Sequence, residues 1–243
     1  MKLNSLYEYP TSTRALYNGE RMYDVGTENK LPSVTTILSA TQPEEKRAAL
    51  AAWQARVGTT EATRIKDQAA SRGTVMHHVL EGWLLDKPHV DLTEVGQQAE
   101  KMAYQIWNQG LQNRLSEFWG LEVTLYYPGL YAGATDVVGI YDKEESIVDF
   151  KQSNKPKRKE WISDYMLQLA AYALAHNEVY GTNINKGVNL ICTKDNLFQE
   201  FVFEGNEFRQ AKFDWLRRVD QYYNERIKNN EPISPTQGSS NDS

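Results

Sequence analysis

Two aspartates and a lysine in the middle of the sequence have the residue types and the spacing of a catalytic site. Asp136 follows a glycine-rich run, and Asp149 and Lys151 lie in or next to the apolar stretch 146–151. Because side chains alternate along a β-strand, this stretch places Asp149 and Lys151 on one face. A salt bridge between them is the simplest interpretation. The alternative is that Asp136 and Asp149 bind a metal ion and that Lys151 acts on a water molecule.

The composition is that of a globular domain, and it restricts the metal chemistry. Of the 243 residues, 40% are apolar and 24% are charged, and the formal net charge is −5. This charge argues against a protein that coats nucleic acid through bulk positive charge, although it leaves room for a local basic channel. Cys192 is the only cysteine, so the chain alone forms neither a disulfide nor a cysteine-ligated iron–sulfur cluster. Any metal ion must therefore rest on carboxylate, imidazole and carbonyl groups.

The sequence predicts one domain followed by a tail. We expect residues 1–230 to form a single domain with additional helices towards the N-terminus. Residues 231–243 are rich in Pro, Ser, Gly and Asn, which predicts a disordered tail. No signal peptide is recognisable, and no apolar run approaches the roughly 18 residues of a membrane span, so we expect no membrane partner. We expect a cytoplasmic protein of a bacterium or of a phage-infected host cell.

Hydrophobic periodicity predicts an α/β protein in which helices and strands alternate along the chain. Apolar residues at three- and four-residue spacing indicate two helices within 43–68, with a break near Gly58, and helices at 75–86, 94–117, 161–180 and 206–228. Alternating patterns indicate strands at 21–25, 121–127, 130–141, 146–151, 187–193 and 197–203. Residues 71–74 are expected to interrupt the helical region. The predicted fold class is a mixed β-sheet flanked by α-helices.

His77 and Glu81 lie four residues apart in the helix expected after residue 74, so they share one face at the edge of its apolar stripe. A histidine at such an edge is more often structural than functional. The alternative is that His77 is a nitrogen ligand of a metal ion, and that Glu81 binds the metal through water or fixes the imidazole. The same spacing places Gln168 and Tyr172 on one face of a later helix.

Two further stretches could contact phosphate groups. The densest basic run, 152–159, contains Lys155, Lys157 and Arg158. Such a run is usually a solvated loop, but directly after the proposed site it could bind the backbone of a nucleic acid. The hydroxyl-rich segment 33–36 could cap a helix or hold a phosphate.

Together these residues could hydrolyse phosphodiester bonds. A metal-dependent phosphodiesterase needs hard oxygen ligands and a cation that steadies the developing charge. Asp136 and Asp149 could each supply a carboxylate oxygen, and the backbone carbonyl of Phe150 could supply a third ligand. His77 would add a nitrogen ligand, while Lys151 could orient or deprotonate the water. Such a mixed site fits Mg²⁺ or Mn²⁺.

Four short motifs occur in an order that identifies a family resemblance. They are Gly73-Thr74-x-x-His77-x-x-x-Glu81, Gly133-x-x-Asp136, Asp149-x-Lys151-x-Ser153 and Gln168-x-x-x-Tyr172. The set resembles the motifs of the PD-(D/E)xK nucleases in their RecB-like branch, over roughly residues 31–225. Residues 32–36 and 149–153 most resemble the mitochondrial genome-maintenance exonucleases and their relatives in phages and bacteria.

The resemblance implies a restriction-endonuclease-like core and the cleavage of DNA, with a preference for single strands or free ends. It implies that His77, Asp136 and Asp149 are metal ligands, that Glu81 is a weaker candidate, and that Lys151 is the catalytic lysine. The residues implied to line the site or contact the nucleic acid are Gln168, Tyr172, Ser153 and Arg72. Some members of the branch carry four cysteines for an iron–sulfur cluster, which this chain cannot supply.

Two other interpretations stay open at this point. The fold could belong to a non-catalytic module that binds DNA ends or assembles with other proteins. The same residues could also form structural salt bridges in an unrelated α/β protein. We expect a Mg²⁺- or Mn²⁺-dependent DNA exonuclease of replication, recombination or repair, acting alone or recruited by proteins of those processes.

Overall fold

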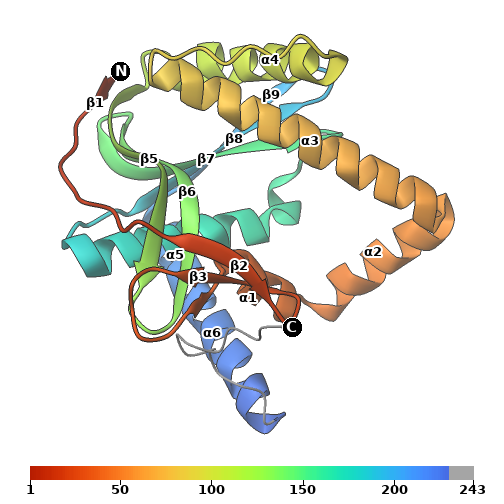
Figure 1. Ribbon diagram of the computed structural model, residues 1–243, viewed down its shortest axis with the longest axis vertical. Coiled ribbons are helices and arrows are strands. Elements are labelled where there is room, and N and C mark those ends of the chain that lie inside the picture. Colours follow the sequence, from red (N-terminus) through yellow and green to blue (C-terminus); the bar gives the residue numbers. More distant parts are fainter. Residues whose placement is uncertain (230–243) are drawn as a thin grey trace.

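A mixed six-stranded β-sheet forms the centre of the protein (Figure 1). The computed structural model describes residues 1–229, so the tail expected at residues 231–243 lies outside the described part of the chain. Across the sheet the strands follow the order β1-β5-β6-β7-β8-β9. Their bounds are β1 Lys2–Leu3, β5 Leu115–Tyr127, β6 Tyr131–Tyr141, β7 Glu144–Ser153, β8 Lys186–Thr193 and β9 Phe198–Phe203.

The sheet combines antiparallel and parallel pairs. Short turns join β5, β6 and β7 into an antiparallel meander. β7 and β8 run parallel, and helix α5 (Ser163–Tyr180) makes the connection between them, because parallel neighbours need a long crossover. β8 and β9 are again antiparallel. The predicted mixed sheet is therefore confirmed.

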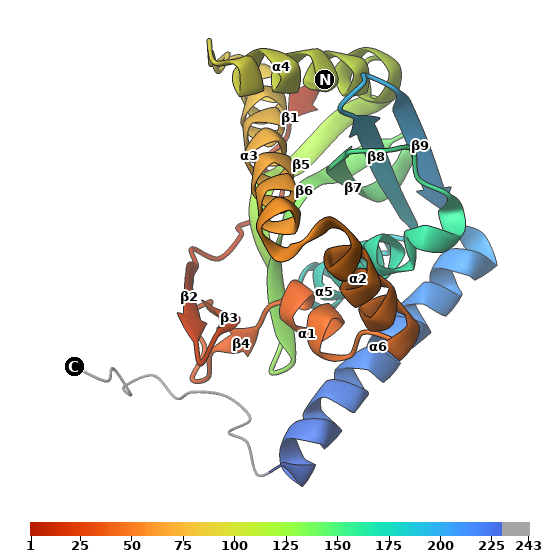
Figure 2. The same ribbon diagram turned by 90° about the vertical axis from the view of Figure 1, so that its right-hand side faces the viewer.

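Helices cover both faces of this sheet (Figure 2). The other helices are α1 Val34–Ala40, α2 Glu44–Val57, α3 Thr59–Leu84, α4 Glu94–Ile106 and α6 Gly205–Lys228. Strand β7 serves both faces by alternation: Val148 and Phe150 pack with α3 and α4, whereas Ile147 packs with α5 and α6. Burial of these two apolar clusters supplies the main driving force for folding.

None of the helices within residues 1–229 combines the length and the apolar character that a membrane-spanning segment requires.

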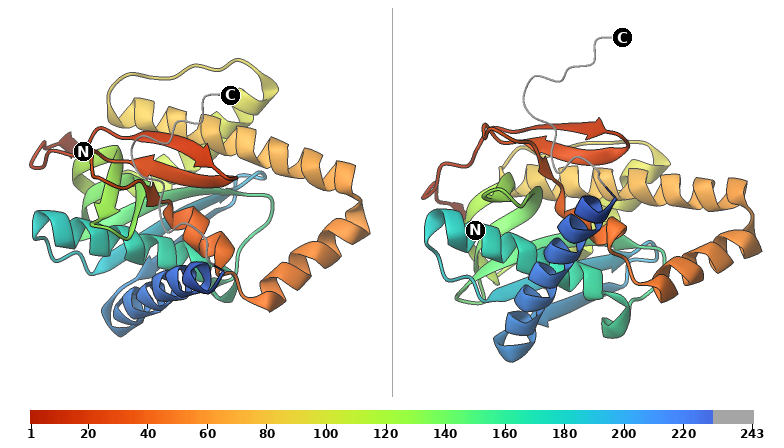
Figure 3. Two further views of the ribbon diagram at one scale, coloured as in Figure 1. Left: turned by 60° about the horizontal axis from the view of Figure 1, so that its bottom comes forward. Right: turned by 90° about the horizontal axis from the view of Figure 1, so that it is seen from below.

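Helices α2 and α3 form a bent arm that projects to one side of the sheet (Figure 3). The bend lies at Gly58, whose φ of +85° belongs to the left-handed region that favours glycine. The break predicted there is confirmed. The interruption predicted at residues 71–74 is wrong, because α3 continues through Gly73. The tertiary contacts of this turn, including a 2.8 Å hydrogen bond from Arg72 to Gln152, override the poor helix propensity of glycine.

The helix predicted at 94–117 is shorter than its pattern suggested. Helix α4 ends at Ile106, a π-helical turn extends to Leu111, and β5 begins at Leu115. At Gly110 the chain passes so close to the sheet that a Cβ would lie 2.9 Å from a β8 side chain. The apolar spacing of Leu111 and Leu115 therefore comes from a turn and a strand that bury both residues.

A smaller sheet of β2 (Thr13–Tyr17), β3 (Glu20–Asp24) and β4 (Leu31–Pro32) precedes α1. The strand predicted at 21–25 corresponds to β3. The hydroxyl-rich segment that follows caps the helix, because Ser33 Oγ accepts a hydrogen bond from the Thr36 N–H at 2.9 Å. Ser33 is itself buried. The Ser33 hydroxyl therefore serves as the N-terminal cap of α1.

Gly139→Ala is expected to lower the free energy of unfolding by about 1 to 3 kcal/mol, because overpacking against rigid groups costs this much. A Cβ at this position would lie 2.3 Å from the Glu117 carbonyl oxygen and 2.6 Å from Phe118 Cα. Urea unfolding measures the effect. Gly73→Ala is the matched control: its nearest contact is the Gln152 side chain at 3.2 Å, and alanine favours the helix. It should change stability by less than about 1 kcal/mol. Equal losses at both positions would contradict the close approach of β5 and β6.

Candidate active site

The candidate site lies where β6 and β7 separate. The described backbone pairing between these strands ends at Val137 and Val148. Beyond this pair come Asp136 and Asp149, both buried. Asp136 Oδ2 accepts a hydrogen bond from the Phe150 N–H at 2.5 Å, so the carboxylate takes the place of a strand partner. The separation thus brings together the two acidic residues that the sequence singled out.

Asp149 and Lys151 form the ion pair expected from their alternation. Lys151 Nζ lies 2.8 Å from Asp149 Oδ1 and 2.7 Å from Oδ2. The Asp149 side chain is 3% exposed and that of Lys151 is 21% exposed. The carboxylate is therefore held inside the protein, while part of the Lys151 side chain is exposed to solvent.

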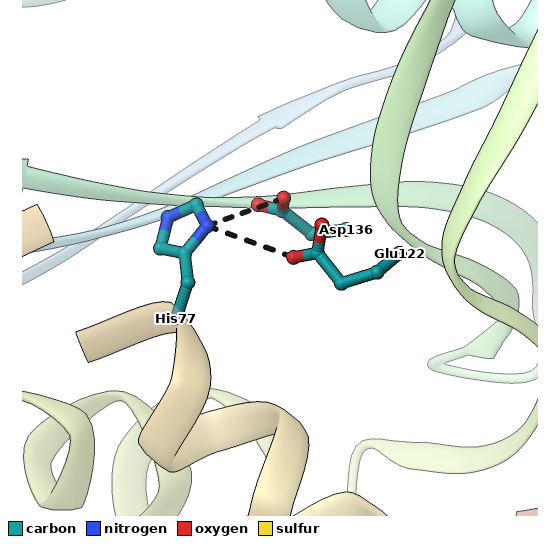
Figure 4. A group of neighbouring side chains, drawn as sticks. All are labelled: His77, Glu122 and Asp136. Atoms are coloured by element: carbon teal, nitrogen blue, oxygen red, sulfur yellow. Dashed lines mark ion pairs between the residues drawn. The ribbon is translucent and has the colours of Figure 1, made fainter. Parts of the chain in front are cut away.

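His77 reaches the same place from α3, as predicted. Its Nε2–H donates to the Phe150 carbonyl oxygen at 2.9 Å, and its Nδ1 lies 3.4 Å from Asp136 Oδ1. Figure 4 shows the ring pointing at both carboxylates of the group. Helix α3 packs on the face of β7 opposite to the one that Ile147 and Asp149 share. The two sides meet only because β6 and β7 have separated.

Glu122 completes this group, and the sequence analysis gave it no role. Its Oε1 lies 3.7 Å from His77 Nδ1. The residues before and after it pair with Val137 and Thr135, so Glu122 stands opposite Asp136, and opposite residues of paired strands share a face. Its φ of +51° is left-handed, a strained conformation for a non-glycine residue that concentrates at functional sites. Only the register of β5 and β6 could have identified it.

The group fits a hard divalent cation. One ligand atom each from His77, Glu122 and Asp136 lie within 4.8 Å of one another, close to the roughly 4 Å between opposite ligands of a six-coordinate Mg²⁺ ion. Carboxylate oxygens, imidazole nitrogen and the nearby Phe150 carbonyl oxygen suit Mg²⁺ or Mn²⁺. The group does not include Glu81, one turn further along α3, or Asp149, which is held by Lys151.

Electrostatics in this group favour a protonated histidine. Burial by itself lowers the pKa of His77, but the carboxylates of Asp136 and Glu122 outweigh it and raise the pKa to about 9. The imidazolium then acts as the cation of the group. A metal ion that uses the ring as a ligand must displace its proton.

The neighbouring ion pair is also perturbed. Burial raises the pKa of Asp149 to about 6, although Lys151 opposes the change. Burial lowers the pKa of Lys151, but Asp149 and Asp136 outweigh it and raise the pKa above its usual value. Lys151 is therefore an ammonium ion at neutral pH, which favours the orienting role over the deprotonating one.

Gln168 and Tyr172 lie on α5 beneath the site. Gln168 Nε2 donates to the Tyr172 hydroxyl at 3.1 Å, and Tyr172 is only 3% exposed. A Cβ on Gly133 would lie 2.9 Å from the Tyr172 ring. Glycine is therefore required at position 133 for steric reasons. It lets the Tyr172 ring pack directly against β6, the strand that carries Asp136. Of the two residues, Gln168 is the more accessible.

A groove with a volume of about 930 Å³ lies beside the end of β7, where Gln152 and Ser153 line it. It is lined by α2, α3, the segment after β7, the start of α5 and the turn between β8 and β9. Tyr165 joins it to the site, because its ring lies 5.4 Å from Lys151 Nζ. Among the described lining residues, Glu61 and Asp195 are acidic, and the basic ones are Arg56, Arg64, Arg72, Lys155, Lys157 and Lys194. The groove is thus a local basic surface in a chain of net negative charge.

Only some of the residues predicted to contact nucleic acid line the groove. Those that line the groove are Arg72, Ser153, Lys155 and Lys157. Ser153 also shapes its loop, since its Oγ donates to the Lys155 carbonyl oxygen at 2.6 Å. Arg158 lies outside the lining, and its guanidinium stacks on the Trp161 ring at 5.2 Å. The basic run therefore contributes only part of its charge to the groove.

The arm supplies groove residues that the sequence analysis missed. Trp53 and Arg56 come from α2, and Arg64 comes from the first half of α3. No residue of α2 is buried, so this helix of the arm is held away from the apolar core. A helix with basic residues and a half-buried tryptophan, but without a buried residue, was the available signal.

The stability of the metal-free protein is expected to fall as pH rises from about 4 to 6, by up to roughly 3 kcal/mol. The reason is that the pKa of Asp149 is about 6 in the fold, so the unfolded chain loses this proton at a lower pH than the folded protein does.

The raised pKa of His77 gives a second change in stability. Its stabilisation is complete below about pH 6.5 and is lost as pH rises through about 9. Urea unfolding in chelator measures both changes. Saturating Mg²⁺ should stabilise more at higher pH, because it needs deprotonated ligands. A flat profile between pH 4 and 6 would contradict the buried, ionisable state of Asp149, and Asp149→Asn should remove this limb of the profile.

The sequence is similar to curated relatives of a single kind. It is 29% identical to mitochondrial genome maintenance exonuclease 1 of Xenopus tropicalis over 206 residues, which is 79% of this chain and 57% of the relative. It is 29% identical to the Mus musculus protein of the same name, over 80% of this chain and 59% of that relative. The chain thus spans less than two thirds of the length of these relatives.

Other comparisons are less close. No family model matches the chain. A crystal structure of a candidate exonuclease from Eubacterium rectale aligns with a TM-score of 0.49 and 17% identity, covering 72% of each chain. The sequence relatives and the ordered motifs agree with each other. The chain is a homologue of the mitochondrial genome maintenance exonucleases, which is consistent with the PD-(D/E)xK nuclease resemblance of its motifs.

Proposed function

We propose that the protein is a divalent-metal-dependent DNA exonuclease that hydrolyses phosphodiester bonds in single-stranded DNA or at DNA ends. One observation carries the proposal: His77, Glu122 and Asp136 converge beside the Asp149–Lys151 pair, and a basic groove lies next to them, linked through the Tyr165 ring 5.4 Å from Lys151 Nζ. Relatives that are named exonucleases support it.

Each residue of the site has a separate task. Asp136, Glu122 and the Phe150 carbonyl would hold Mg²⁺ or Mn²⁺, with His77 as the nitrogen ligand and Asp149 as a further carboxylate. The bound ion would polarise the attacking water and offset the negative charge that develops on the phosphate. Phe150 contributes twice, because its N–H fixes Asp136 and its carbonyl faces His77.

Lys151 is placed to act on the phosphate group. Its ammonium group is held by both oxygens of Asp149 and faces Tyr165 at the end of the groove. A fixed cation at this point stabilises the charge of the transition state more than that of the substrate. The raised pKa of Lys151 keeps it in this charged form.

The groove suits a single strand. Its basic side chains can follow a phosphate backbone, and Trp53 and Tyr165 offer rings on which bases can stack. Such a combination binds single-stranded nucleic acid with little sequence preference. We therefore propose single-stranded DNA as the preferred substrate.

The arm formed by α2 and α3 offers a structural reason why the protein would act at free ends of DNA. One end of α2 is tied to the body, because Lys46 Nζ lies 3.0 Å from Asp164 Oδ2 and 2.7 Å from Ser163 Oγ on α5. The other end continues into α3, whose C-terminal half packs on the sheet. A strand that lies between the arm and the body is enclosed by the chain, so it would enter by a free end.

Activity in replication, recombination or repair within a bacterial or phage-infected cell is part of the proposal, with proteins of those processes as partners. The alternative, a non-catalytic module that binds DNA ends, would need the same groove without turnover. The retained lysine and carboxylates favour the enzyme.

Lys151→Ala is expected to lower the rate of DNA degradation at least 100-fold, because it removes the cation beside the phosphate. Purified protein is incubated with end-labelled single-stranded DNA in Mg²⁺, in Mn²⁺ or in chelator. Lys101→Ala, an exposed lysine of α4, is the matched control and should leave the rate unchanged. Circular dichroism of both variants tests folding. Wild-type activity in chelator, or full activity of Lys151→Ala, would overturn the mechanism.

A covalently closed circle of single-stranded DNA tests the need for ends. The wild-type protein is expected to degrade the linear form and to leave the circle intact. Cleavage of the circle would require an endonuclease assignment, and binding of linear DNA without any turnover would favour the non-catalytic module.

Removal of groove charge is expected to weaken binding in a salt-dependent way. In a Lys151→Ala background, Arg56→Ala and Lys157→Ala should each lower the slope of log Kd against log salt concentration by about 0.7, the value for one phosphate contact of a single strand. Fluorescence anisotropy with a labelled oligonucleotide gives the slopes. Arg209→Ala, an exposed arginine on α6, should leave the slope unchanged. Equal slopes for all variants would place the nucleic acid elsewhere.

A further inference from the structure

Asn189 is a polar residue in the middle of a buried strand. All residues of β8 are buried, and Asn189 stands between Val188 and Leu190 with 0% exposure. Asparagine is disfavoured in strands, and burial of its amide costs free energy unless both ends are hydrogen-bonded. This position therefore needs an explanation beyond packing.

One end of the amide is bound to a residue of the proposed site. Asn189 Nδ2 donates to Asp149 Oδ2 at 3.0 Å, and the contact is buried. The two residues are also direct partners in the parallel pairing of β7 and β8. With Lys151 on both of its oxygens, Asp149 is held from two sides and its carboxylate has a fixed orientation.

The register extends this contact into a row across the sheet. Glu122 on β5 stands opposite Asp136 on β6, and Asp149 follows on β7 at the place where those strands separate. Asn189 on β8 is the next member of the row. Four neighbouring strands thus each contribute one hydrogen-bonding side chain at the same level, and three of these residues are carboxylates.

The other end of the amide has no partner within the described part of the chain. Asn189 Oδ1 is buried and accepts no hydrogen bond. A leucine of similar size would fill the same space without leaving a buried acceptor unsatisfied. The fold tolerates the free-energy cost of this unsatisfied oxygen, while the Asn189 amide N–H donates to Asp149. This indicates that the amide serves the carboxylate rather than the packing of the core.

We propose that Asn189 is a positioning residue of the metal site, which acts by fixing the carboxylate of Asp149, the further ligand in the proposed function, beside the His77–Glu122–Asp136 group. The inference rests on the proposed function. Partners that orient a metal ligand from behind typically change metal affinity by 10- to 100-fold when they are removed.

The test is Mn²⁺ binding to the full chain without DNA, measured by isothermal titration calorimetry and by the electron paramagnetic resonance signal of free Mn²⁺. Asn189→Leu is expected to raise the Kd for Mn²⁺ by about 10- to 100-fold, with a thermal unfolding midpoint close to that of wild type. Asn189→Ala, which introduces no new bulk, serves the same purpose if the leucine variant does not fold.

Thr135→Val is the matched control. Thr135 Oγ1 is likewise buried and without a partner among the described residues, and it contacts no residue of the metal site in the hydrogen bonds of the structure. Its removal should leave the Mn²⁺ affinity within about twofold of wild type. A metal effect of the same size in this variant would show a general response of the sheet and overturn the specific role of Asn189.

The outcomes separate the two proposals. Unchanged Mn²⁺ affinity in a folded Asn189 variant, beside a wild-type protein that binds Mn²⁺ and degrades DNA, overturns the role of Asn189 alone. A wild-type protein that neither binds Mn²⁺ nor degrades DNA overturns the metal site itself. A weakened metal affinity in the Asn189 variant but not in Thr135→Val supports the inference.

Discussion

The separation of β6 and β7 is the constraint on which the candidate site depends. Where backbone pairing ends, Asp136 accepts the Phe150 N–H that a strand partner would otherwise have satisfied. This exchange holds a carboxylate inside the sheet at the point where the two strands separate. His77 from one side and the Asp149–Lys151 pair from the other then share one small space. Continued pairing would have left each group on its own face of the sheet.

The same constraint explains why the site is electrostatically costly. Asp136 and Asp149 are buried, and burial raises the pKa of each. Two cations, the imidazolium of His77 and the ammonium of Lys151, offset this charge within the protein. A divalent cation would offset it more effectively, since its ligands are already grouped. Buried charge and a strained backbone, such as that at Glu122, are features that concentrate at functional sites.

The sequence by itself determined the fold class and the placement of Asp149 and Lys151 on one face of a strand. Alternation in 146–151 placed Asp149 and Lys151 on one face, and helical spacing brought His77 to the border of a core; both follow from local geometry alone. Patterning therefore gave most strands and helices. It failed at residues 71–74 and 94–117, where glycine and apolar spacing were outweighed by contacts with the sheet. Local propensity is a weak preference that tertiary packing overrides.

Only the tertiary structure decided which other groups lie beside these residues. Glu122 and Asn189 depend on the register of β5 with β6 and of β7 with β8, and register is set by long-range pairing rather than by any nearby residue. The groove depends on the arm, which brings Trp53 and Arg56 to the segment after β7. Net charge could not show this, because a local potential depends on where charges lie in space and not on their sum along the chain. Asp136, Asp149 and Lys151 could be identified from the local sequence, whereas the groups that surround them are set by the tertiary structure.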